Sequence, residues 1–91
     1  MSVEEDMRRR LEQALAPELL ELHDDSSKHE GHAGWREGGN THWRVTIVSA
    51  AFAGKMTVAR HRMVYAALGE LMQHPIHALQ ISDRAPGESG G

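Results

Sequence analysis

The sequence predicts a small α/β (α+β) fold in the order α-β-β-α-β, in which one three-stranded mixed sheet has both helices packed on one face. Two segments repeat apolar residues at helical spacing, and three short segments alternate apolar with polar residues. A chain of 91 residues can build only one modest core. We therefore expect a single domain over residues 1–85 and a disordered tail over residues 86–91.

The first helix is expected over residues 3–16. Ser2 and Glu5 can form a capping box at its start, and Pro17 ends it because proline cannot continue a helix. Its apolar residues recur at helical spacing: Val3, Met7, Leu11, Ala14 and Leu15. This spacing predicts one apolar face that packs against the sheet.

The first strand is short and leads into a long loop. Leu20 and Leu22 alternate with polar neighbours, as is typical of a strand with one buried face. Residues 24–40 contain four glycines and follow neither the helical nor the strand period. Loops of this length are unusual in so small a domain and are usually functional or disordered.

The remaining elements form a strand-helix-strand unit. The second strand alternates Trp43, Val45 and Ile47 with polar residues, and the third alternates His77, Leu79 and Ile81. The helix between them is expected over residues 56–73, with an apolar stripe of His61, Val64, Leu68, Leu71 and Met72. A right-handed crossover makes these two strands parallel, whereas the first two strands should pair antiparallel.

Charge is unevenly distributed along the chain. The net charge of −3 argues against a dedicated nucleic-acid binder. Residues 41–69, however, hold four basic residues and no acidic one: Arg44, Lys55, Arg60 and Arg62. Such a segment can contact phosphate or an acidic partner, and the alternative is an ordinary solvated helix start.

The first thirty residues contain no apolar segment typical of a signal peptide, and no apolar run approaches membrane-spanning length. A cytoplasmic location is therefore the default expectation. The chain also lacks cysteine, so any thiolate ligand must come from another molecule.

Most of the seven histidines are interpreted as structural. His61 lies on the apolar stripe of the second helix and is expected to be a hydrogen-bonded core residue, and His42 is interpreted in the same way. His74 precedes Pro75 and suits the end of a helix, where the dipole favours a positive charge.

His32 and His77 are the candidate metal ligands. His32 lies in the long loop and His77 opens the third strand, so both can reach one point at the rim of the sheet. Two neutral imidazoles leave a metal site to be completed by water, substrate or another protein. His29 lies three residues from His32 and is the alternative loop ligand.

Four motifs together resemble the BolA family: THW before an alternating strand, VS followed by F-x-G, then RHR-x-V-Y, and finally IHAL. The resemblance spans residues 7–85 and implies a KH-like α/β fold. This agrees with the element order predicted from periodicity.

The resemblance also implies a function. BolA proteins carry a histidine or cysteine in the loop between the first two strands and a histidine in the IHAL segment, and these ligate a 2Fe-2S cluster shared with a monothiol glutaredoxin. The matching positions here are His32, in GHA, and His77, in IHAL. The partner's cysteine and its bound glutathione would supply the other ligands, so no cofactor is expected to be tightly bound by this chain alone. The implied protein is a regulator or adaptor in iron-sulfur cluster trafficking or iron and redox regulation.

The alternative function is a DNA-binding transcriptional regulator, a role also described for BolA members. The segment FAGKMTVARHR would contact duplex DNA weakly, through Lys55, Arg60 and Arg62. It lacks a G-x-x-G loop, and the strands lack stacking aromatic pairs, which disfavours RNA. The chain is not expected to be an enzyme, because no local nucleophile and base are paired and a three-stranded sheet offers little room for a substrate pocket.

Overall fold

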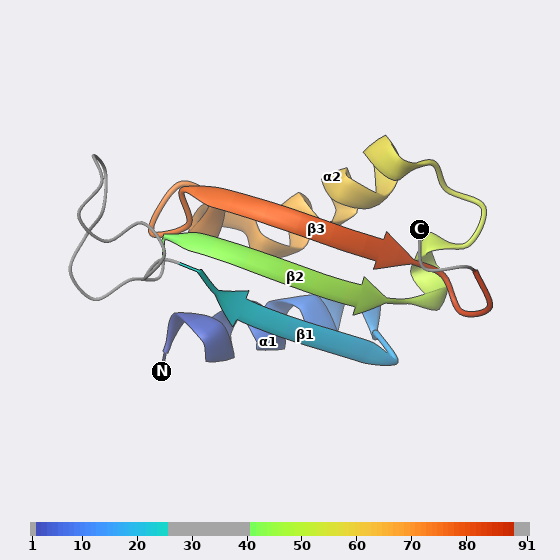
Figure 1. Ribbon diagram of the computed structural model, residues 1–91, viewed down its shortest axis with the longest axis horizontal. Helices are drawn as coiled ribbons and strands as arrows, with labels where there is room; N and C mark the ends of the chain where they lie inside the picture. Colours follow the sequence, from blue (N-terminus) through green and yellow to red (C-terminus); the bar gives the residue numbers. More distant parts are fainter. Residues whose placement is uncertain (1, 26–40, 89–91) are drawn as a thin grey trace.

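The computed structural model describes residues 2–25 and 41–88, in which both helices cover the same face of one three-stranded sheet (Figure 1). The predicted mixed α+β class and the order α-β-β-α-β are confirmed. The elements in chain order are α1 (Val3–Leu15), β1 (Leu19–Asp24), β2 (His42–Val48), the 3₁₀ turn η2 (Ala50–Phe52), α2 (Thr57–Leu68), the 3₁₀ turn η3 (Gly69–Met72) and β3 (Ala78–Arg84).

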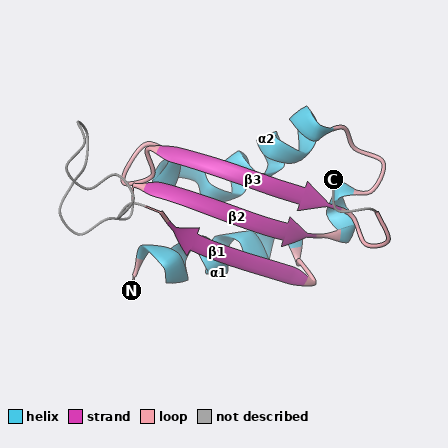
Figure 2. Ribbon diagram, viewed as in Figure 1, coloured by secondary structure: helices cyan, strands magenta, loops and turns pink. Residues whose placement is uncertain are grey.

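Strand β2 lies at the centre of the sheet (Figure 2). It pairs antiparallel with β1, with Leu19 opposite Val48, and parallel with β3, with His42 opposite Ala78. The end of β1 and the starts of β2 and β3 therefore lie together at one end of the sheet, which we call the loop rim and define by Asp24, His42 and Ala78. The opposite end of the sheet is the carboxyl rim, where β2 and β3 end at Val48 and Arg84.

The core lies between the sheet and the helices. The alternation in β2 buries Trp43, Val45 and Ile47 and leaves Arg44 exposed. The helices contribute Met7, Leu11, Leu15, Val64 and Leu68. Ala14 is exposed, contrary to its predicted place on the α1 stripe, because it lies outside the arc that faces the sheet.

The predicted capping box is half formed, because Ser2 Oγ accepts a hydrogen bond from the Glu5 N–H at 3.1 Å. The second helix is shorter than predicted. Helix α2 ends at Leu68, and Gly69 adopts a positive φ of 56° that leads into η3. Arg10 donates a hydrogen bond at 3.1 Å to the Leu68 carbonyl, which compensates for the interrupted helix.

Residues 86–88, assigned to the tail from the sequence, form a turn in which the Glu88 N–H donates to the Ala85 carbonyl at 3.1 Å. Ala85 itself is buried in the core. Neither helix within residues 2–25 and 41–88 has the length and hydrophobicity that a membrane-spanning segment requires.

Candidate functional site

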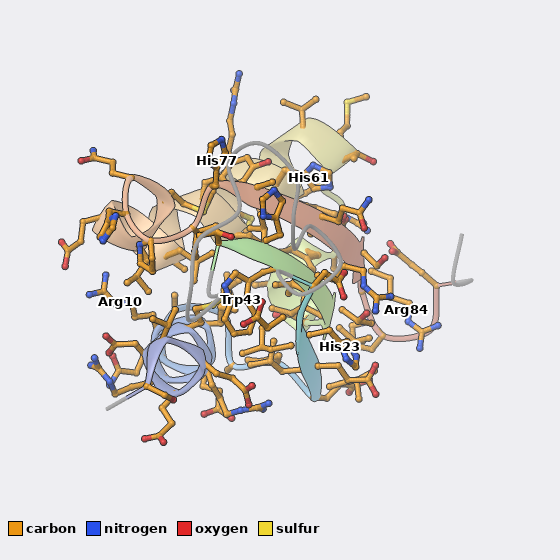
Figure 3. The ribbon with its side chains drawn as sticks, turned by 60° about the vertical axis from the view of Figure 1, so that its left-hand side comes forward. Arg10, His23, Trp43, His61, His77 and Arg84 are labelled. Atoms are coloured by element: carbon orange, nitrogen blue, oxygen red, sulfur yellow. The ribbon has the colours of Figure 1, made fainter. Side chains whose placement is uncertain are left out.

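Backbone hydrogen bonds hold His77 at the loop rim. Its N–H donates to the Thr41 carbonyl at 2.7 Å, and the next N–H, that of Ala78, donates to the same oxygen at 3.0 Å. The Asp25 N–H donates to the His42 carbonyl at 2.7 Å. The three strand ends are thus tied together, and the His77 side chain projects from a fixed backbone (Figure 3).

His42 lies directly beside His77. The two rings stack with their centroids 5.7 Å apart and their planes 10° from parallel. His42 Nδ1 also lies 3.0 Å from Thr41 Oγ1, and its side chain is only half-buried. The sequence interpretation of His42 as a core residue therefore missed this neighbour. The contact follows from the register of the two parallel strands. His42 pairs with Ala78, which is the residue after His77.

The His77 ring is available to a ligand. The residue is exposed, and within residues 2–25 and 41–88 no hydrogen bond or ion pair engages the ring. The ring lies at an open depression of about 290 Å³ that His74 and Pro75 also line. A neutral imidazole in this position can donate a lone pair to a metal.

The other predicted ligands, His29 and His32, lie outside the described residues. The described chain stops at Asp25 and resumes at Thr41, and backbone hydrogen bonds join these two residues to His42 and His77 at the loop rim. In the part of the chain that the structure describes, no group of three or more histidine or acidic side chains could hold a metal. Among the described residues of this rim, His77 could supply one ligand, and a metal site needs several.

Of the predicted basic residues, Arg60 lies at the carboxyl rim with Lys55 beside it, whereas Arg44 pairs with Asp25 near the loop rim. The Arg60 guanidinium is already engaged in an ion pair, because Nη1 and Nη2 donate to the two carboxylate oxygens of Glu88, each at 2.7 Å. This ion pair and a hydrogen bond from the Ala85 N–H lower the pKa of Glu88 to about 2. Lys55 and Arg62 are exposed, and no ion pair within the described residues includes them.

His61 faces the end of β3. Its Nε2 lies 2.9 Å from Asp83 Oδ1, the geometry expected of a hydrogen-bonded structural histidine. The ring is less buried than its place on the predicted apolar stripe implied, since 32% of the side chain remains exposed. Val64 and Leu68 on the same stripe are fully buried.

Comparisons with known proteins agree on one family. Residues 11–88 match the family model described as BolA-like protein. The chain is 47% identical over 88 residues to BolA-like protein 1 of Pongo abelii, a match that covers 97% of this chain and 61% of that protein. It is 42% identical over 86 residues to SufE-like protein 1, chloroplastic/mitochondrial, of Arabidopsis thaliana, covering 90% of this chain and 23% of that protein.

The chain thus spans about three fifths of the length of the BolA-like protein 1 relatives that it matches. Among solved structures, the BolA domain of SufE1 from Arabidopsis thaliana superposes with a TM-score of 0.85 at 39% identity, and the match covers 98% of each chain. The family model, the BolA-like protein 1 relatives and the solved structure therefore agree, because all of them carry BolA descriptions.

Proposed function

The chain belongs to the BolA family, and we propose that it is a regulatory adaptor that forms a complex with a monothiol glutaredoxin and shares a 2Fe-2S cluster with it. The observation that carries this proposal is the exposed His77 ring, held on a hydrogen-bonded backbone at the rim where the described chain stops at Asp25 and resumes at Thr41. In this proposal His77 and His32 hold the cluster from this side, with His29 as the alternative loop ligand.

The residue chemistry supports a shared site. The chain has no cysteine, so the thiolates must come from the glutaredoxin and its glutathione. Neutral imidazole ligands in place of thiolates leave a cluster less negative and raise its reduction potential, which suits sensing or transfer better than low-potential electron transport. The SufE-like relative, which contains a BolA domain within a longer chain, supports an association with iron-sulfur pathway proteins.

The chain's own residues would orient the ligand. The Thr41 carbonyl fixes the backbone of His77, and the stacked His42 ring restricts rotation of the His77 side chain. Groups that orient a ligating histidine commonly affect metal affinity nearly as much as the ligands do. His42 is therefore a positioning residue in this proposal.

The alternative function, a DNA-binding transcriptional regulator, gains no support from the carboxyl rim. Of the four cations in residues 41–69, Arg60 is paired with Glu88 and Arg44 with Asp25. Two exposed cations remain in an acidic chain, and they provide few phosphate contacts.

The test is co-expression with a monothiol glutaredoxin from the same source, followed by visible absorption and circular dichroism spectra of the purified pair. We expect a stable heterodimer whose cluster spectrum differs from that of the glutaredoxin homodimer. A pair that does not co-purify, or one that shows only the homodimer spectrum, would exclude the shared cluster.

A further inference from the structure

At the carboxyl rim, the guanidinium of Arg60 is fixed from inside the fold. Its Nε donates to the Lys55 carbonyl at 2.8 Å, and its Nη1 lies 3.7 Å from Asp83 Oδ2. The centre of the group lies 5.9 Å above the buried ring of Phe52. Only 11% of the Arg60 side chain is exposed, so the cation has little freedom to move.

Glu88, the anion of the pair, is held much more loosely. It follows Pro86 and Gly87 in a turn at the surface, where Gly87 adopts a φ of 87° and 40% of the Glu88 side chain is exposed. Within the described residues, Glu88 accepts the two hydrogen bonds from Arg60 and forms a reciprocal pair of hydrogen bonds with Ala85. Outward movement of residues 86–88 breaks these hydrogen bonds, whereas Ala85 stays buried and Arg60 keeps its contacts with Lys55, Asp83 and Phe52.

The pair lies in an open groove of about 650 Å³ between the ends of β2 and β3 and the start of α2. Among its lining residues, two arginines, Arg60 and Arg84, balance two carboxylates, Asp83 and Glu88. Asp83 is almost buried and accepts a hydrogen bond from His61, so it stays with the fold. Departure of Glu88 alone leaves the groove with an excess positive charge beside a preformed guanidinium fork.

We propose that the Arg60 groove is a carboxylate-binding site for an acidic segment of a partner protein, and that Glu88 occupies it as an intramolecular latch. The present occupant is a carboxylate on a peptide turn, and a planar guanidinium fork matches carboxylate geometry. The exposed Lys55 and Arg62 near the start of α2 extend the positive field and would steer an acidic segment toward the groove. The site lies at the opposite end of the sheet from His77, so it does not depend on the proposed cluster function.

The test measures binding of a capped tetraglutamate peptide at low ionic strength through the NMR shifts of the Ser82 and Arg84 backbone amides, which line the groove in every variant. The tethered Glu88 carboxylate competes with the peptide, and a latch that is open in about one molecule in ten lowers the apparent affinity about tenfold, so Glu88→Gln should tighten peptide binding by about that factor. Adding Arg60→Gln to that variant should abolish the gain. Glu70→Gln is the matched control, because it removes an equal charge from the exposed ion pair with Arg10.

The proposal is overturned if Glu88→Gln binds the peptide no tighter than Glu70→Gln. A gain for a short DNA duplex but not for the peptide overturns it as well, because the groove would then be a phosphate site.

A second measurement uses the unsubstituted chain and therefore remains possible if Glu88→Gln does not fold. In native-state hydrogen exchange, the Glu88 amide should exchange at least about tenfold faster than the Val45 amide in the central strand, because the latch opens locally. Equal protection of the two amides would show that the turn opens only with the whole domain and would refute the latch.

Discussion

The two rims of the sheet differ in how their ionisable side chains are satisfied. At the loop rim, His77 is exposed, and within the described residues no hydrogen bond or ion pair engages its ring. At the carboxyl rim, Arg60, His61, Asp83 and Glu88 bind one another in a continuous network. A group that must accept an external ligand needs a free lone pair, whereas a satisfied network either holds the fold or must open before it binds. In our two proposals, the open ligand site therefore lies at the loop rim and the latched site at the carboxyl rim.

The largest expected effect is at the loop rim. His77→Ala should abolish the cluster spectrum of the glutaredoxin heterodimer, because it removes the one candidate ligand that the structure presents on a fixed backbone. Since the side chain is exposed, the free energy of unfolding should change by less than about 0.5 kcal/mol. The measurements are visible circular dichroism of the co-purified pair and urea unfolding of the chain alone.

His23→Ala is the control for that experiment, because His23 is an exposed histidine on β1 that is not proposed as a ligand. His32→Ala should weaken the heterodimer spectrum. An unchanged spectrum and cluster lifetime in His77→Ala would remove the loop rim from consideration as the ligand site.

The second effect concerns the network at the carboxyl rim. Asp83→Ala should destabilise the fold by about 1–3 kcal/mol, because the side chain is only 8% exposed and its loss leaves His61 without its acceptor. The cluster spectrum should not change. Urea unfolding measures the loss, with Ser82→Ala, an exposed neighbour on β3, as the control. Asp83→Ala with control-like stability would mean that this network does not hold the fold.

A third prediction separates ring stacking from ligation at the loop rim. His42→Ala should shorten the lifetime of the heterodimer cluster by about tenfold, because the His77 ring loses the neighbour that restricts its rotation. His42→Phe should restore most of that lifetime, since phenylalanine can stack but cannot ligate. The decay of visible absorbance under a chelator gives the lifetimes. If His42→Phe behaves like His42→Ala, His42 acts through its ring nitrogens and not through stacking.

The smallest effect is the pH dependence of the latch. Folding lowers the pKa of Glu88 from 4.5 to about 2, mainly through the Arg60 guanidinium. The unfolded chain therefore binds a proton in that interval while the folded chain does not, so the contribution of Glu88 is complete above about pH 5 and is lost as the pH falls toward 2. The difference in melting temperature between the unsubstituted chain and Glu88→Gln should shrink over that range. A difference that stays constant from pH 7 to about pH 2 would mean that Arg60 does not hold this carboxylate in solution.

The sequence by itself determined the local features of this protein. The alternation of Trp43, Val45 and Ile47 predicted β2 and its buried face, Ser2 and Glu5 predicted the start of α1, and Pro17 marked its end. Such signals are readable because periodicity and capping depend on residues that are neighbours in the chain. The IHAL match likewise singled out His77, whose role as a ligand stays a prediction.

The tertiary structure alone decided which distant side chains meet. His42 was interpreted as a core residue until the parallel register placed it on His77, and Arg60 was counted as a free cation until Glu88 proved to be its partner. The predicted second helix is divided at Gly69, which has a positive φ, and Arg10, from the other helix, binds the Leu68 carbonyl at that point. Each of these outcomes depends on strand register and helix packing, which are set by the burial of the whole core and leave no periodic mark near the residues concerned.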